Sequence, residues 1–242
     1  MQPALSLQNV SHAFGENRIL QSVSLELEQG HYFAIAGVNG AGKSTLIKII
    51  LDLIRPESAS QIQLFGQSNR VPECRSQLAY LPERFSVNKR VSGWQYLQFV
   101  ASVFAIELDP GAIETLLRQF DFPSERLQSD VSEYSKGMMQ KLGLISCFVL
   151  ERKLLILDEP LSGLDPKARY HFKAYLEATR SNERTLFYST HMLADAEEIC
   201  DRFAILHDGE IRFIGTPEEC MQRYRGDTLE KAYMNCVTAV SG

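Results

Sequence analysis

The sequence contains no apolar run long enough to cross a lipid bilayer. A membrane-spanning helix needs about 18 to 20 consecutive apolar residues, and no stretch of this chain approaches that length. The first residues also lack the charged and then apolar pattern of a signal peptide. These absences predict a chain that stays in the cytosol.

Cysteine and positive charge are both in short supply. The five cysteines, Cys74, Cys147, Cys200, Cys220 and Cys236, are odd in number and form no C-x-x-C pair, so we interpret them as reduced thiols rather than disulfides or metal ligands. With 25 Lys and Arg against 30 Asp and Glu, the formal net charge is −5. The sequence therefore predicts no nucleic-acid partner.

A glycine-rich stretch is the most informative motif that is present. Residues 37–45 read Gly-Val-Asn-Gly-Ala-Gly-Lys-Ser-Thr and match the phosphate-binding P-loop, G-x-x-x-x-G-K-[ST]. Residues 31–36 predict a buried strand before it, and Thr45 to Ile50 predict the start of a helix. In this context backbone N–H groups and a helix N-terminus can hold a triphosphate. A glycine-rich turn without a ligand is the alternative.

The residue types in the P-loop match separate parts of phosphate binding. Lys43 would reach the β- and γ-phosphates of ATP, and the Ser44 hydroxyl would ligate Mg²⁺. The predicted nucleotide-binding residues in this stretch are Gly37, Asn39, Gly40, Ala41, Gly42, Lys43, Ser44 and Thr45.

Hydrophobic patterns on either side predict an α/β protein. Residues 5–10 and 20–27 predict an antiparallel pair of strands. The apolar run 154–157 predicts a strand covered on both faces, and the alternating helices and strands that follow it predict a parallel sheet. Asp208-Gly209 predicts a two-residue hairpin turn.

From about residue 91 to 150 the period becomes helical. Asp109 and Pro110 predict the cap and first turn of one helix. Because strand signals resume only at Leu154, we expect an inserted helical subdomain. Trp94 and Phe99 are predicted to lie in its core rather than to form a ligand platform.

Two carboxylates directly follow the 154–157 strand. In open α/β sheets ligands bind at the C-terminal ends of the strands, so Asp158 and Glu159 should lie on the P-loop edge. Asp158 would support Mg²⁺, and Glu159 would orient and deprotonate a water in line with the γ-phosphate. Taken alone, Asp-Glu-Pro could merely end a strand; beside a P-loop the chemical interpretation is favoured.

Further motifs follow in a fixed order. Residues 134–141, Tyr-Ser-Lys-Gly-Met-Met-Gln-Lys, resemble the L-S-G-G-Q signature of ABC ATPases. Residues 80–83 stand where the Q-loop belongs, 162–165 match the D-loop, and 189–191 match the switch histidine. Phe14 occupies the place of the adenine-stacking aromatic. Over essentially its whole length the chain resembles the ATP-binding subunit of an ABC transporter.

The resemblance implies a RecA-like P-loop NTPase fold, with a mixed sheet, an N-terminal antiparallel β portion and an inserted helical subdomain. A single ABC ATPase domain would cover residues 1–242. Within it, 1–86 and 151–216 would form the ATP-binding core and 87–150 the helical subdomain with the signature. Residues 217–242 would form a short C-terminal extension.

The resemblance also implies a composite site between two ATPase modules. A second copy, or a related ATPase subunit, would pair head to tail, so that Ser135 and Gly137 reach the γ-phosphate bound by the partner. Ser135 is also predicted to cap the helix that begins near Lys136. His191 would hydrogen-bond the γ-phosphate and hold the attacking water and Glu159 in place.

Some positions depart from the family pattern. Glu83 stands where most relatives have glutamine, so the metal contact there would involve a carboxylate or a water bridge, together with Ser44 and Asp158. The pattern Tyr-Ser-x-Gly-Met at 134–138, together with Leu-Pro-Glu, resembles the exporter ATPases of the ABC-2 type. Residues 215–219, Gly-Thr-Pro-Glu-Glu, also fit that group.

The resemblance therefore implies ATP hydrolysis that energises transport through separately encoded integral-membrane permease subunits. The chain would bind peripherally to the cytoplasmic face of the membrane. The segment Phe85 to Phe104 would face the permease, which would put Trp94 near a groove rather than deep in the core. A soluble ABC ATPase with an assembly or scaffold partner is the alternative. A P-loop kinase or GTPase gives the 134–138 signature no role.

Overall fold

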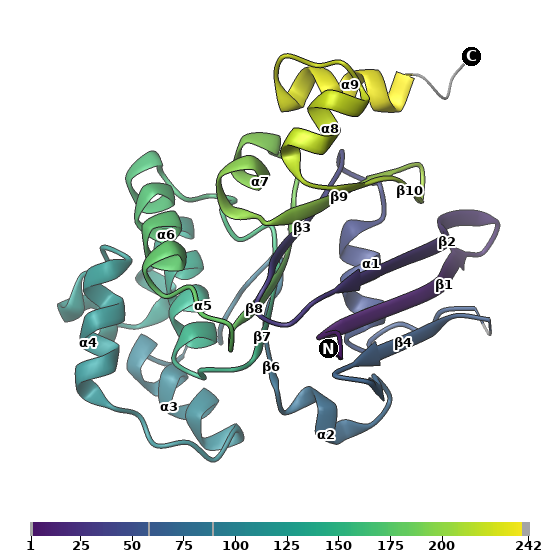
Figure 1. Ribbon diagram of the computed structural model, residues 1–242. Helices are drawn as coiled ribbons and strands as arrows, with labels where there is room; N and C mark the ends of the chain where they lie inside the picture. The colour runs from purple at the N-terminus through teal and green to yellow at the C-terminus, as the bar shows by residue number, and fades with distance from the viewer. Residues whose placement is uncertain (1, 58, 89, 239–242) are drawn as a thin grey trace.

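The computed structural model describes residues 2–57, 59–88 and 90–238. It contains a six-stranded sheet in the order β10-β9-β3-β8-β7-β6 (Figure 1). Its strands are β3 (Tyr32–Ala36), β6 (Leu78–Leu81), β7 (Leu154–Asp158), β8 (Thr185–Thr190), β9 (Arg202–His207) and β10 (Glu210–Gly215). Neighbouring strands run parallel except for β10, which runs antiparallel to β9. The predicted mixed sheet is confirmed.

A second sheet carries the N-terminus. It has the order β2-β1-β4-β5 and is antiparallel throughout. Its strands are β1 (Leu5–Phe14), β2 (Asn17–Leu27), β4 (Gln61–Leu64) and β5 (Gln67–Ser68). This confirms the predicted N-terminal antiparallel β portion.

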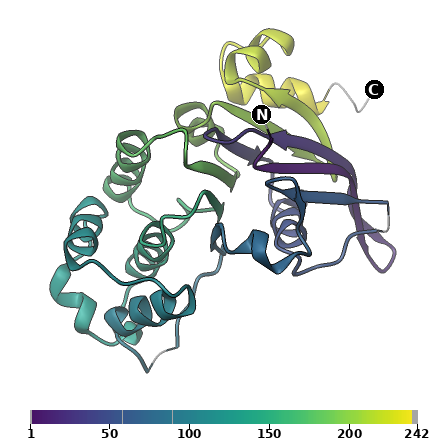
Figure 2. The ribbon, with the colours of Figure 1, turned by 60° about the horizontal axis from the view of Figure 1, so that its bottom comes forward.

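The helices follow the α/β rhythm of the chain. They are α1 (Lys43–Ile50), α2 (Pro72–Arg75), α3 (Gly93–Val103), α4 (Pro110–Gln119), α5 (Lys136–Phe148), α6 (Pro166–Ala178), α7 (Leu193–Ile199), α8 (Pro217–Arg223) and α9 (Leu229–Thr238). Short 3₁₀ turns occupy Ser124–Gln128 and Val131–Glu133. Two views show α3 to α6 on one side of the molecule and α1 with the four-stranded sheet on the other (Figures 1 and 2).

The six-stranded sheet separates two hydrophobic cores. Because successive strand side chains point to opposite faces, Ala34 and Leu155 pack with the helical side, whereas Ile35 and Ile156 pack with the opposite side. The second core also contains α1 and the inner face of β1 and β2. Helix α1 is therefore enclosed in apolar packing between the two sheets.

Local sequence signals place the helix starts and one turn as predicted. The Asp109 carboxylate accepts a hydrogen bond from the N–H of Gly111 at 2.9 Å and caps α4. The Ser135 hydroxyl accepts one from the N–H of Met138 at 3.2 Å and caps α5. Asp208 and Gly209 both have positive φ, 48° and 76°, as a two-residue hairpin between β9 and β10 requires.

The prediction that Phe99 lies in the core is wrong. Its side chain is 63% exposed on α3, whereas Trp94 is half-buried. The buried stripe of α3 runs through Leu97 and Ala101. Phe99 follows Leu97 by two residues, which is roughly 200° around the helix, so its ring faces outward.

The predicted C-terminal extension contains α8 and α9, which lie beside β10 and α7 (Figure 1). Its residues 239–242 lie outside the described residues. All five cysteines are free, as predicted. Within the described ranges, no helix combines the length and apolarity that a membrane span requires.

Phe120 and Phe99 test the assignment of side chains to the core and to the surface. Phe120 is 1% exposed and packs against the rings of Phe148, Phe172 and Tyr175. We expect Phe120→Ala to reduce the free energy of unfolding by about 3–5 kcal/mol. Phe99→Ala, the matched control, should change it by less than about 0.5 kcal/mol. Urea unfolding of the purified protein measures both, and equal losses would contradict the assignment.

Candidate functional site: a P-loop pocket at one edge of the sheet

The P-loop connects β3 to α1 and needs glycine at two close contacts. Gly42 has φ of 107°, and a Cβ added there would lie 2.8 Å from Leu20 Cδ2 and 2.9 Å from the Ile19 carbonyl oxygen. A Cβ on Gly37 would clash with the Leu206 carbonyl oxygen. The β1–β2 hairpin and β9 thus press on the loop and fix its path.

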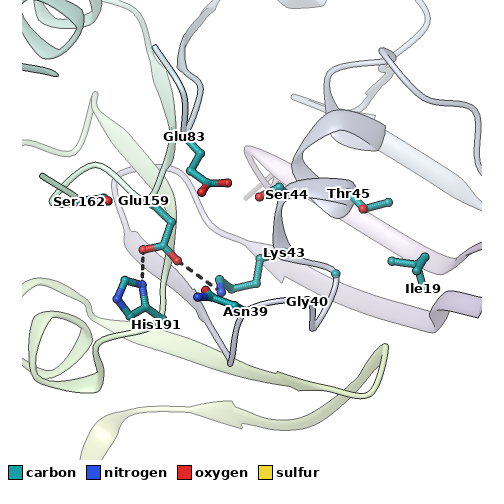
Figure 3. A pocket seen from close by; sticks show the side chains of 11 residues that line it. Ile19, Asn39, Gly40, Lys43, Ser44, Thr45, Glu83, Glu159, Ser162 and His191 are labelled. Carbon is teal, nitrogen blue, oxygen red and sulfur yellow. Dashed lines mark hydrogen bonds and ion pairs between the residues drawn. The ribbon is translucent and has the colours of Figure 1, made fainter. Parts of the chain in front are cut away.

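A pocket of about 400 Å³ opens at the loop (Figure 3). Its lining residues come from the P-loop, the β1–β2 hairpin and the segments that follow β6, β7 and β8. They are Ile19, Asn39, Gly40, Gly42, Lys43, Ser44, Thr45, Glu83, Glu159, Ser162 and His191. The structure therefore brings most of the predicted site residues to one cavity.

Lys43 is held beneath this pocket by the loop itself. Its side chain is 6% exposed, and Nζ donates to the carbonyl oxygens of Gly37 at 2.7 Å and Val38 at 3.3 Å. Nζ also lies 3.3 Å from Glu159 Oε1. A buried ammonium needs such partners, and they fix its position at the pocket floor.

Glu159 joins the P-loop to His191. Its Oε2 lies 2.7 Å from Nδ1 of His191, while Oε1 faces Lys43 (Figure 3). Glu159 has φ of 51°, a left-handed conformation that is costly for a residue with a Cβ and that concentrates at functional sites. The bend turns its carboxylate from the strand end into the pocket.

Asp158 lies behind the pocket lining at the end of β7. It is 2% exposed, and the Ser189 hydroxyl donates to its Oδ1 at 2.5 Å. Burial raises the pKa of Asp158, and the hydroxyls of Ser189 and Ser44 oppose that rise by stabilising the carboxylate. The nearby Glu83 and Glu159 charges act in the same direction as burial.

Other predicted residues lie outside the pocket lining. Gly37 and Ala41 belong to the loop backbone around it, and Ala41 is buried. Phe14 is 54% exposed at the end of β1, where the centroid of its ring lies 4.6 Å from the centroid of the His12 ring in an edge-on arrangement. Ser135 and Gly137 lie at the start of α5, where a Cβ on Gly137 would be 3.4 Å from the Gly163 carbonyl oxygen.

Three residues that were not predicted as site residues contribute, namely Ile19, Ser162 and Ser189. Ile19, from the β1–β2 hairpin, lines the pocket, and nothing in its sequence context separates it from an ordinary strand residue. Ser189 contacts both Asp158 and Glu159. Its partners at the end of β7 become apparent only when β8 is paired with β7 in the sheet, so no signal in the sequence identified this role.

A P-loop opposite a buried Asp-Glu pair defines the class of nucleotide-binding P-loop proteins. A family model described as ABC transporter matches residues 20–162. The chain is 34% identical over 244 residues to the ABC-type transporter ATP-binding protein EcsA from Bacillus subtilis, covering 98% of both chains. A solved structure described as the ATP binding subunit of an ABC transporter has a TM-score of 0.84 and 32% identity, covering 97% of this chain and 99% of that one.

An uncharacterized ABC transporter ATP-binding protein from Nostoc is 34% identical over 205 residues, which is 84% of this chain and 61% of that protein. The chain thus spans about three fifths of that relative's length. The chain belongs to the ABC transporter family. It is an ATP-binding component of that family and carries its ATPase domain.

The close contacts of Gly42 give the first test of the site. Gly42→Ala places a Cβ against Leu20 and Ile19 at a φ that L-residues rarely adopt, so the loop must shift. We expect ATP affinity to fall by about tenfold or more, which is at least about 1.4 kcal/mol. Gly15→Ala is the control, because Gly15 has φ of 60° but no atom within 4 Å of an added Cβ. Equal affinities in titrations with a fluorescent ATP analogue would refute the contact argument.

Proposed function

We propose that this chain hydrolyses ATP with Glu159 as the general base and couples hydrolysis to export through membrane permease subunits. The observation that carries the proposal is the convergence of Lys43, Glu159 and His191 on one pocket. Lys43 would bind the β- and γ-phosphates while Glu159 activates water. His191 would hydrogen-bond the γ-phosphate and hold Glu159 and the attacking water in place.

The two carboxylate oxygens of Glu159 have different neighbours. Oε2 is engaged by His191. Oε1 is buried and has no hydrogen-bond partner within the described part of the chain, although Lys43 Nζ lies 3.3 Å away as an ion pair. When the γ-phosphate draws Lys43 toward itself, Oε1 is the oxygen left to accept a proton from water.

The residues present fit Mg²⁺ bound together with the nucleotide. Within the described residues, no group of three or more His, Cys, Asp or Glu side chains could hold a metal ion by itself. Mg²⁺ is commonly held by one or two carboxylates plus substrate phosphates. The oxygens of Ser44, Glu83 and Asp158 supply such ligands, and Figure 3 shows Glu83 and Ser44 facing the same space. Mg²⁺ would neutralise charge that develops on the phosphates.

We further propose that two copies, or this chain and a related ATPase subunit, close over ATP head to tail. Support comes from the exposed N-terminus of α5. There Ser135 and Gly137 present a hydroxyl and a helix N-terminus that suit a phosphate, yet neither lines the pocket of its own chain. The partner's γ-phosphate would complete that contact.

Glu159→Gln tests the base and the dimer together. We expect kcat to fall by about a hundredfold or more with little change in ATP affinity, because the amide cannot take a proton. Unhydrolysed ATP should then hold the variant as a dimer in size-exclusion chromatography. Adding Ser135→Arg should abolish that dimer but leave ATP binding intact. Retained turnover would remove Glu159 as the base, and an unaffected dimer would remove Ser135 from the interface.

A second pocket supports a permease-facing surface. This groove of about 270 Å³ is lined by Leu51, Arg75, Leu78, Tyr80, Tyr96, Val100, Phe104, Ser146, Cys147 and Leu150. Phe99 and Val103 on α3 are 63% and 62% exposed, and exposed apolar side chains beside a groove are typical of interaction sites. We propose that 87–150 acts as a helical subdomain that receives a cytoplasmic segment of the permease here.

We propose export, and a peripheral position on the cytoplasmic face of the membrane, because of the residues in two motifs. Tyr134-Ser-Lys-Gly-Met138 and Leu81-Pro-Glu83 resemble the ABC-2 exporters. The alternative, a soluble ABC ATPase with a scaffold partner, is less favoured because the relatives described above are named as transporter components.

The docking surface can be tested with charge substitutions. Phe99→Asp and Val103→Asp should release the chain from washed membranes that contain its permease, because a charge must be desolvated when the groove is covered. ATP hydrolysis by the purified chain should stay close to wild type. Met234→Asp is the control, since Met234 is 54% exposed on α9 at the opposite end of the molecule. Release by Met234→Asp alone, or recovery of only a soluble scaffold with the wild-type chain, would contradict the proposal.

A further inference from the structure

Ser189 lies at the centre of the site without lining its pocket. It is fully buried on β8, the strand between β3 and β7. In the parallel register it is paired with Ile35 on the P-loop strand and with Asp158 on the other side. Every other residue of β8 is buried too. A hydroxyl in this position must find partners within the protein.

The Ser189 hydroxyl has two partners, and both belong to the Asp-Glu pair. It donates to Asp158 Oδ1 at 2.5 Å and accepts from the backbone N–H of Glu159 at 2.9 Å. A hydroxyl carries one proton and two lone pairs, so the bond to Asp158 uses its only donor. One oxygen therefore fixes a side chain and the next backbone N–H at the same time.

Glu159 depends on such an anchor because its backbone is left-handed, with φ of 51°. Conformations of this kind persist only where the surroundings enforce them. The chain leaves β7 after Asp158, and the N–H of Glu159 bonds to the Ser189 hydroxyl rather than continuing the strand ladder. Without that oxygen a buried N–H would have no acceptor.

We infer that Ser189 is a positioning residue for ATP hydrolysis, which orients the Glu159 carboxylate toward the water and holds Asp158 toward the metal. Its hydroxyl sets the direction in which the chain turns into the pocket. The inference rests on the proposed roles of Glu159 and Asp158. Ser189 does not line the pocket and acts through its two neighbours.

Thr185 at the other end of β8 supplies a matched control. Its hydroxyl is also buried and also accepts a backbone N–H, from Gly30 at 2.9 Å. That contact lies at the opposite end of the strand from the pocket. Thr185→Val thus removes a comparable hydrogen bond from the same strand without touching the site.

The test compares Ser189→Ala, Ser189→Thr and Thr185→Val in the full chain. For Ser189→Ala we expect kcat to fall by about tenfold or more, ATP affinity to stay within about twofold, and the half-saturating Mg²⁺ concentration to rise. Ser189→Thr keeps a hydroxyl and should retain more turnover. Thr185→Val should lower the melting temperature but leave kcat unchanged. Equal kcat losses in Ser189→Ala and Thr185→Val, or in Ser189→Ala and Ser189→Thr, would overturn the inference.

A double variant separates this inference from the proposed function. The part of the effect that runs through Glu159 should disappear in the Glu159→Gln background, so Ser189→Ala should lower kcat there by a smaller factor than in the wild-type chain. An equal loss in both backgrounds would show that Ser189 does not act through Glu159. Normal turnover by Ser189→Ala beside an inactive Glu159→Gln would overturn the inference alone. Normal turnover by Glu159→Gln would instead overturn the assignment of the base.

Discussion

The site depends on one buried carboxylate that touches two other segments. Glu159 follows β7, yet its oxygens meet Lys43 from the P-loop at 3.3 Å and His191 from the end of β8 at 2.7 Å. Removing either Glu159 or Lys43 leaves the other charge buried with fewer partners, which is costly. The same contacts hold the pocket together and place the proposed base, Glu159, beside Lys43, the lysine proposed to bind phosphate.

That carboxylate is placed by the order of the strands. Because β3, β8 and β7 are parallel neighbours, their C-terminal ends deliver the P-loop, Ser189 and Asp158 to one edge. Alternating side chains bury both faces of the sheet, and α1 is packed between the two sheets. The helix that starts at Lys43 therefore cannot move without disturbing a core. A rigid scaffold of this kind suits a site proposed to hold a flexible triphosphate.

The sequence predicts what depends on local chemistry. The P-loop, the cap at Asp109 and the Asp208-Gly209 turn each have residue types that permit few other structures. Predictions are weaker where a side chain's direction depends on distant packing. Phe99 has the composition of a core residue but lies on the outward face of α3. The role of Ser189 appears only once β8 is aligned with β7, because its partners are 30 and 31 residues away.

The end of β6 and the residues that follow it contribute to two of the pockets described above. Tyr80 lines the groove beside α3, and three residues later Glu83 lines the nucleotide pocket. A shift of the backbone at the end of β6 would therefore be felt in both pockets, whereas a substitution on the outer face of α3 would reach the groove alone. The proposed permease contact and the proposed ATP site are joined here by the continuous chain from Tyr80 to Glu83.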